Sequence, residues 1–376
     1  MRMYIHQNKR WPDFIMDEHS ILPCLAQVRH AQGMLVGKLS SLGFETQNQA
    51  FLESLSASTI TTAAIEGEHF NAHSVRSSIA KRLGIKNIEK ATADRHIDGV
   101  VDVLLDATQQ AEQPLTRKRL FAWHAALFPT GYSGLTKIAV GTWRPLDRDT
   151  MRVVSGKHGF EHVHFEAPES SRLPSEMKRF LEWANAKEDG DAVLKAAIAH
   201  LWFVTLHPFD DGNGRIARAI ADLFLTRADG LPQRFYSMSA QILKERKGYY
   251  TILEQTQKGT LEITPWILWF LECLEKSIHA SDNLLKNILQ KAEFWRTHQS
   301  TPLNERQSKM LNKLWDGFEG PLTSSKWAKM TGVSQDTATR DIQDLITKQI
   351  LCSEAAGGRS TRYVFAIEKT KTGSVP

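Results

Sequence analysis

Residues 206–218 read LHPFDDGNGRIAR and join two apolar segments that have helical periodicity. A proline disfavours helical geometry at the residue before it, so Pro208 is expected to end the first helix near His207. Gly212 and Gly214 permit unusual backbone angles at the start of the second helix. Backbone amides in such a turn, reinforced by the positive end of the helix dipole, form a site for an anion.

Four polar side chains in this stretch suit polyphosphate chemistry. Arg215 and Arg218 lie one helical turn apart, so both guanidinium groups can face one anion. Asp211 offers hard oxygen ligands that suit Mg²⁺, and the neutral imidazole of His207 can accept a proton from an incoming hydroxyl. Each group taken singly is more often structural, but together they indicate a phosphoryl or nucleotidyl transfer site. The stretch is neither a P-loop nor a dinucleotide-binding fingerprint after a strand.

Residues 207–218 resemble the Fic motif HPFxxGNGRxxR and match it at every fixed position. The resemblance implies an enzyme that transfers AMP from ATP, with Mg²⁺, to a Ser, Thr or Tyr hydroxyl of a target protein or of the chain itself. It implies His207 as general base and Asp211 as the Mg²⁺ ligand. It places Arg215 at the α- and β-phosphates and Arg218 at the γ-phosphate. The nucleotide-binding residues implied within the motif are Phe209, Gly212, Asn213, Gly214, Arg215 and Arg218.

A second motif lies upstream, where residues 61–68 read TTAAIEGE. Without the resemblance, this segment is a helix end at which Gly67 stops the helix. The spacing of Thr62, Glu66 and Gly67 also resembles the inhibitory motif [S/T]xxxE[G/N] of Fic proteins that carry their own inhibitory helix. A carboxylate paired with Arg218 would occupy the guanidinium that should hold the γ-phosphate. The hypothesis is therefore an enzyme inhibited by its own Glu66.

Between residues 131 and 168 the helical period is lost, and two short strands are predicted within 151–165. In the Fic family a hairpin at this place is the flap, which docks a target segment as an added strand. Further along the chain, Tyr249 and Tyr250 lie where family members build the adenine pocket, followed by Trp266 and Trp269. Aromatic residues at helical spacing are also typical of a core.

Two histidine pairs resemble fragments of metal sites. His69 and His73 have helical spacing, whereas His162 and His164 alternate onto one face of a predicted strand. No HExxH motif is present and no third ligand is evident in the sequence, so a surface or interface role is predicted for both pairs.

The C-terminal segment favours a winged helix. Thr323 and Ser334 are predicted helix caps, the second for a helix over 335–347, and 357–365 suit a wing. The residues expected to face DNA bases are Gln335, Asp336, Thr339, Arg340 and Gln343, with Arg359 and Arg362 on phosphate. Asp336, Asp341 and Asp344 weaken the positive charge of this surface. DNA binding and protein docking, including homodimer formation, therefore both stay open.

Composition limits the remaining classes of partner, metal site and cellular location. The net charge of +5 permits a polyanionic partner without requiring one. Cys24, Cys273 and Cys352 lie far apart, which indicates reduced thiols and neither a zinc site nor a disulfide framework. The N-terminus lacks the apolar region of a signal peptide, and no apolar run is long enough for a membrane span. A cytoplasmic protein without membrane contact is expected.

The predicted fold class is mainly α: a Fic-type helical core with a hairpin flap, preceded by a helical region and followed by a winged helix. The predicted division is 1–112, 113–280, a linker helix over 281–300, and 301–370. Helices are expected over 17–40, 47–65, 72–83, 91–113, 117–128, 173–186 and 191–206. Two alternative functions stay open. One is a transcription regulator that senses ATP, and the other is a Fic enzyme that transfers another nucleotide or phosphate, or removes AMP.

Overall fold

The structure is a computed structural model, which describes residues 4–40, 42–85, 91–146, 151–155, 162–187, 190–315, 318, 320–354 and 361–366. The chain divides into two compact units, residues 1–285 and 286–376. Each unit is described by itself below. The predicted mainly helical fold is confirmed.

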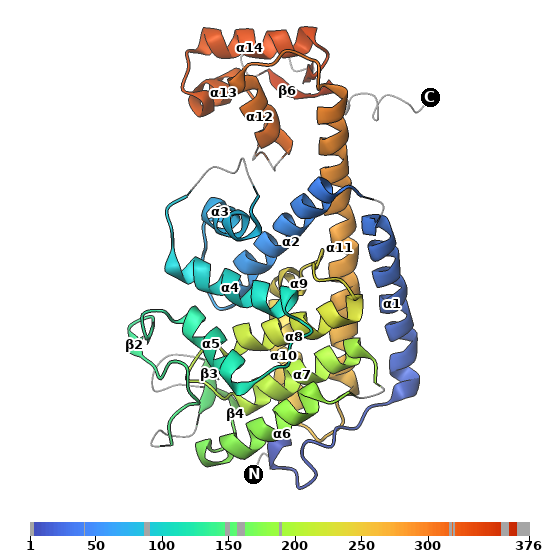
Figure 1. The fold of residues 1–376 in the computed structure, drawn as a ribbon, viewed down its shortest axis with the longest axis vertical. Helices are drawn as coiled ribbons and strands as arrows, with labels where there is room; N and C mark the ends of the chain where they lie inside the picture. Colours follow the sequence, from blue (N-terminus) through green and yellow to red (C-terminus); the bar gives the residue numbers. More distant parts are fainter. Residues whose placement is uncertain are drawn as a thin grey trace. The chain divides into compact units, whose positions relative to one another are not determined.

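Helices build most of the first unit (Figure 1). The helices are α1 (Glu18–Ser40), α2 (Phe44–Ile65), α3 (Ala72–Leu83), α4 (Arg95–Gln109), α5 (Arg117–Leu127), α6 (Leu173–Asn185), α7 (Ala192–Leu206), α8 (Asn213–Asp229), α9 (Met238–Lys244), α10 (Arg246–Gln257) and α11 (Thr264–Thr297). Short 3₁₀ turns, η1 (Ile5–Gln7) and η2 (Ser170–Arg172), and two antiparallel hairpins complete it. The hairpins are β1 (Tyr132–Ser133) with β2 (Thr136–Lys137), and β3 (Arg152–Ser155) with β4 (His162–Glu166).

Most helix boundaries lie within a few residues of the predicted ones, and local caps explain the differences. The helix predicted over 91–113 begins at Arg95, because the Asp94 side chain accepts a hydrogen bond from the His96 amide at 2.9 Å. The predicted strands at 151–165 form β3 and β4, while the hairpin tip, residues 156–161, lies outside the described residues.

The centre of the first unit is the antiparallel pair α7 and α8. Almost every side chain of α7 is buried, so this helix is apolar all round, as expected for a core helix. The structure joins the predicted parts 1–112 and 113–280 into one compact unit, because α2 and α4 pack directly on α8, and α2 also on α9.

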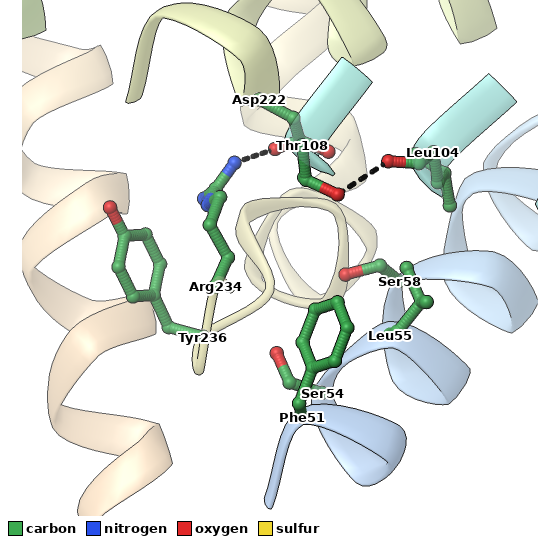
Figure 2. Close-up of a pocket in the computed structure, with 9 residues that line it drawn as sticks. All are labelled: Phe51, Ser54, Leu55, Ser58, Leu104, Thr108, Asp222, Arg234 and Tyr236. Carbon is green, nitrogen blue, oxygen red and sulfur yellow. Dashed lines mark hydrogen bonds and ion pairs between the residues drawn. The ribbon is translucent and has the colours of Figure 1, made fainter. Parts of the chain in front are cut away.

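The junction of α2, α4 and α8 encloses a small pocket (Figure 2). Asp222 and Arg234 form an ion pair at its edge, and Thr108 donates a hydrogen bond to the Leu104 carbonyl. The pocket has a cavity volume of about 10 Å³, far below the roughly 300–1,000 Å³ of typical small-molecule sites. It is therefore a packing junction that joins the N-terminal helices to the central pair.

The longest helix is α11, with 34 residues. The predicted linker helix over 281–300 is the second half of this helix, which begins at Thr264, because no glycine or proline interrupts it after Pro265. Charged residues recur along α11. Among the described residues, no helix is both long and apolar enough to cross a membrane.

The second unit contains the end of α11, helices α12 (Glu305–Trp315), α13 (Ser324–Thr331) and α14 (Gln335–Thr347), and the antiparallel strands β5 (Leu351–Glu354) and β6 (Arg362–Phe365). Thr323 and Ser334 cap α13 and α14 as predicted. Trp327, Leu345 and Phe365 are among the residues of its own core. The wing tip, residues 355–360 with Arg359, lies outside the described residues, and the winged-helix assignment stays a prediction.

Candidate active site

The loop between α7 and α8 has backbone angles that few residue types adopt. His207 ends α7 in the left-handed region, with φ 47° and ψ 57°. Gly212 precedes α8 with φ 79°, and a Cβ atom there would lie 2.8 Å from a ring carbon of Phe128. Glycine is therefore required at 212 both for its backbone angles and for the close approach.

Asn213 fixes this loop from within. Its Oδ1 accepts a hydrogen bond from the Phe209 amide, and its Nδ2 donates to the Phe209 carbonyl, both at 2.9 Å. The Phe209 ring is fully buried and lies parallel to the His124 ring, 4.2 Å away. The side chains of Phe209 and Asn213, assigned by resemblance to nucleotide binding, are thus directed into the loop and the core. The Asn213 amide is hydrogen-bonded within the loop and the Phe209 ring is packed in the core, so both residues shape the anion site rather than line it.

His124 was not singled out in the sequence, yet it supports the loop. The Gly141 amide donates to its Nδ1 at 3.1 Å, so the ring proton is on Nε2 and points to the Asp211 carbonyl at 3.2 Å. Burial lowers the pKa of His124 to about 4, so the ring is neutral near pH 7. No local sequence pattern predicts this role, because the contact spans 87 residues.

The His207 imidazole has one defined tautomer. Its Nδ1 lies 3.1 Å from the Val204 carbonyl, which can only accept, so Nδ1 carries the proton and Nε2 keeps its lone pair. Burial lowers the pKa of His207; the hydrogen bond to Val204 opposes this effect and the charge of Arg144 adds to it. The ring is therefore neutral at pH 7 and able to accept a proton.

Arg144 anchors the backbone beneath this histidine. Its Nε donates to the His207 carbonyl at 3.0 Å, and its backbone amide donates to the Pro208 carbonyl at 2.9 Å. Its other guanidinium nitrogens bind Ser170 Oγ and the Pro168 carbonyl. Arg144 thus ties the loop to the segment that follows β4.

Asp211 lies at the opposite lip from His207 and is half-buried. Its Oδ1 accepts from the Gly212 amide at 2.6 Å, and its Oδ2 accepts from the Ser133 hydroxyl of β1. The carboxylate is thereby oriented, and among the described residues no basic side chain forms an ion pair with it. Such a carboxylate, next to an anion site, suits a magnesium ion that also binds phosphate oxygens.

The two motif arginines are both paired with the N-terminal region. Arg218 is 2% exposed; its Nε donates to Thr62 Oγ1 at 2.9 Å and its Nη2 to Glu66 Oε1 at 2.7 Å. Arg215 Nη1 lies 3.1 Å from Glu68 Oε1, and its guanidinium lies over the Phe128 ring. The structure thus brings the two sequence motifs together. The Glu68 contact was not foreseen, because Glu68 lies outside the recognised spacing.

The Glu66 carboxylate also reaches the first turn of α8. A Cβ atom on Gly214 would lie 2.6 Å from Glu66 Oε1 and 3.2 Å from Arg218 Nη1. Glycine at 214 therefore allows a carboxylate to approach the backbone at the positive end of the helix. The Glu66 carboxylate of the chain itself thus occupies the anion site that the sequence predicted.

The two tyrosines on α10 differ in exposure. Tyr249 is 1% exposed, and its hydroxyl lies 2.9 Å from His200 Nε2, so it packs in the core beneath Arg218. Trp266 is fully buried beside it. Tyr250 is 40% exposed and its ring faces the Arg246 guanidinium. Of these three aromatic residues, Tyr250 is the exposed one, so its ring is the one that a base could contact.

Comparisons with known proteins agree with this geometry. Residues 114–225 match the Fic/DOC family, and residues 4–85 match DUF4172, a domain of unknown function. The protein adenylyltransferase Fic of Drosophila grimshawi is 34% identical over 104 residues, which are 27% of this chain and 20% of that protein. That of Nematostella vectensis is 34% identical over 116 residues, 30% of this chain and 25% of that protein. The matched region therefore spans a fifth to a quarter of these relatives.

Two solved structures share the fold. A Fic family protein from Desulfovibrio desulfuricans G20 superposes with a TM-score of 0.53 over 95% of this chain and 97% of that chain, at 18% identity. A Fic domain containing signaling protein from Bacteroides thetaiotaomicron VPI-5482 has a TM-score of 0.53 over 69% of this chain and 97% of that chain, at 19% identity. Fold and site together define a helical protein with a Fic-type anion loop. Residues 114–225 match the Fic/DOC family, so this part of the chain is a Fic domain.

Proposed function

We propose that the chain is a protein adenylyltransferase, which transfers AMP from ATP to a Ser, Thr or Tyr hydroxyl. One observation carries this proposal: the free Nε2 of His207 stands at the lip of an anion-binding turn that also presents Arg215 and Arg218. A protein that only sensed ATP would need the arginines but no oriented base. The curated relatives named protein adenylyltransferase Fic support the same chemistry.

The roles of the residues follow from their positions. The first turn of α8 and the two arginines would hold the phosphates of ATP. Asp211 is oriented by Gly212 and Ser133, and it would hold Mg²⁺, which neutralises phosphate charge when bound. The exposed ring of Tyr250 would contact the adenine.

In the transfer step His207 acts as the general base. Nε2 takes the proton of the acceptor hydroxyl while the hydroxyl oxygen attacks the α-phosphorus. The bond from the α-phosphorus to the bridging oxygen breaks, and pyrophosphate leaves. The Nδ1–H bond to Val204 keeps the ring in the required tautomer, and Arg144 holds its backbone.

Autoinhibition by Glu66 is part of the proposal. Its carboxylate occupies both Arg218 and the first turn of α8, which are the groups proposed for the γ-phosphate. ATP bound beside Glu66 would place its phosphates elsewhere and would lose the alignment that attack needs. Thr62 holds Arg218 in this arrangement through its hydroxyl and its carbonyl.

The hairpin β3–β4 is the proposed docking strand for a target segment. An added strand would pair with its free edge through main-chain hydrogen bonds and place a hydroxyl before His207. The chain itself is a candidate target. The identity of the transferred group is the sharpest question, because another nucleotide or a phosphate would use the same cradle.

The decisive experiment uses ATP labelled at either the α- or the γ-phosphate, with the Glu66→Gly protein. We expect protein-bound label from the α-position only, and its loss in Glu66→Gly/His207→Ala. His279→Ala, an exposed histidine on α11, is the matched control and should retain labelling. Label from the γ-position would indicate phosphate transfer instead. Loss of AMP from a labelled target in unlabelled buffer would indicate the reverse reaction.

A second candidate function, DNA binding by the second unit, is favoured by its charge pattern. Asp341 is buried and pairs with Arg306 through both oxygens, at 2.8 and 3.0 Å, and Asp344 pairs with Lys348. The exposed row on α14 is Gln335, Asp336, Thr339, Arg340 and Gln343, as predicted. Two of the three aspartates are thus already paired within the unit.

Labelled duplex DNA, titrated by fluorescence anisotropy at increasing salt, tests this candidate. Arg340→Ala should weaken binding and reduce the salt dependence by about one phosphate contact. Arg296→Ala removes an exposed arginine outside α14 and is the control. Equal binding by both variants, or none at low salt, would contradict DNA recognition by α14.

A further inference from the structure

A cluster of two histidines and a glutamate joins the proposed flap to α10. His162 and His164 lie on β4, with ring centroids 4.6 Å apart, and Glu254 lies on α10. His164 Nδ1 is 2.6 Å from Glu254 Oε2, and His162 Nε2 is 3.8 Å from Glu254 Oε1. One ligand atom from each of the three residues lies within 4.8 Å of the others.

A bulge interrupts the pairing of β4 at His164. Val154 pairs with Val163 and Val153 pairs with Phe165, so the register passes over His164. A bulge of this kind re-aims a side chain and is common beside functional sites. The sequence pattern alone indicated two histidines on one strand face, without a third ligand. The third ligand comes from a helix 90 residues further along the chain.

We infer that His162, His164 and Glu254 form a binding site for a transition-metal ion, with Zn²⁺ as the ion that this ligand set fits. Two imidazoles and a carboxylate match the three protein ligands of zinc sites that keep one position open. Imidazole ligands disfavour Mg²⁺ and Ca²⁺, which prefer oxygen. The site is therefore separate in chemistry from the magnesium position proposed at Asp211.

The geometry needs only small side-chain rotations to close around an ion. Ligand atoms about 2.0–2.1 Å from a tetrahedral zinc ion are about 3.3 Å apart. The side chains are 62%, 32% and 28% exposed for His162, His164 and Glu254, so they can move and an ion can reach them. Zinc would replace the proton shared between His164 Nδ1 and Glu254 Oε2.

Lys258 contacts the carboxylate as well. Its ammonium group pairs with Glu254 Oε1, while Oε2 is directed to His164. Such a contact outside the metal ligands orients a ligand and tunes its affinity.

The site would link the hairpin to the helix that carries Tyr249 and Tyr250. Bound zinc would fix β4 against α10 and so stiffen the strand pair that, on the proposed function, receives the target segment. Zinc binding itself does not depend on that function. It can therefore be measured on the His207→Ala protein without ATP, and failure of AMP transfer would leave the result intact.

The test is competition for Zn²⁺ between the metal-stripped full chain and a chromophoric chelator. We expect about one equivalent of zinc bound near pH 7.5, and at least a tenfold loss of affinity in both His164→Ala and Glu254→Gln. His279→Ala is the matched control, because His279 forms an exposed pair with Glu275 and, within the described part of the chain, belongs to no three-ligand group. Affinity should also fall at pH 5.5, where protons compete for the imidazoles.

Cobalt gives a second measurement on the same proteins. Co²⁺ should show the visible bands of tetrahedral coordination in the parent and in His279→Ala, but not in His164→Ala. Zinc should also slow hydrogen exchange in β3 and β4. No bound zinc, or equal affinity in His164→Ala and His279→Ala, would overturn the assignment.

Discussion

The loop 206–218 and the segment 62–68 meet at one anion site but are held in different ways. The loop has many short-range contacts, such as Asn213 with Phe209 and His207 with Val204, and Arg144 adds a contact from further along the chain. The segment is fixed by contacts that span about 150 residues, and its two carboxylate side chains are 31% and 43% exposed. The loop is thus part of the fold, whereas the segment occupies the site and, on the proposed function, gives way to the phosphates of ATP.

The largest expected effect comes from removing the base in the loop. In a Glu66→Gly background, His207→Ala should lower AMP transfer by roughly 10²–10⁴-fold, the usual contribution of general base catalysis. The rate of α-label incorporation measures it, with the thermal midpoint as a check on folding. A rate within a few-fold of the Glu66→Gly protein would show that the loop supplies no base.

The next effect tests whether the segment is displaceable. Glu66→Gly removes a charge-assisted hydrogen bond to Arg218 worth about 1.5–3 kcal/mol, and so should raise the rate about ten- to a hundredfold. Glu66→Gln keeps the shape and one hydrogen bond without the charge, and it should give a smaller increase. If neither variant differs from the parent in α-label incorporation, Glu66 does not inhibit.

Glu68 sharpens the comparison within the segment. Its carboxylate pairs with Arg215 but is 43% exposed, and exposed pairs contribute only about 0.2–1 kcal/mol. Glu68→Ala should therefore raise the rate less than about fivefold, and the ATP concentration for half-maximal rate should fall with it. Activation equal to that of Glu66→Gly would mean that the two arginines are blocked to the same degree.

The smallest effect is a shift in pH dependence. The base is active when neutral, so the rate falls as pH drops through the pKa of His207, which burial holds below 6.5. The negative charge of Glu66 raises this pKa, so removing Glu66 should shift the acid limb of the profile to lower pH. The pH profile of kcat/KM for the Glu66→Gly protein measures it. An acid limb centred above 6.5 would contradict a buried neutral base.

Prediction from sequence succeeded where local preferences suffice. Pro208, Gly212 and Asn213 define the end of one helix and the start of the next, and the structure has these boundaries at Leu206 and Asn213. The caps Thr323 and Ser334 could likewise be predicted, because each hydroxyl accepts a hydrogen bond from the amide three residues further along. The helix start at 95 rather than 91 was missed, although Asp94 is a cap of the same kind.

Prediction was weaker wherever a side chain's surroundings come from another part of the chain. Phe209 and Tyr249 were expected at the nucleotide, yet their rings are buried, because His124 and His200 pack against them. The roles of Ser133 and Arg144 at the loop had no local signal. His162 and His164 were interpreted as surface residues for the same reason, since Glu254 lies on a distant helix.

The sequence by itself determined the loop, its glycines and the order of base, carboxylate and arginines. These depend on backbone angles and hydrogen bonds within about twelve residues, which short-range chemistry dictates. The upstream motif also indicated Glu66 at Arg218, but only the tertiary structure decided that Glu68 faces Arg215 and that Glu254 faces two histidines. Those contacts arise from the packing of whole helices, which depends on apolar faces throughout the chain and on no single short pattern.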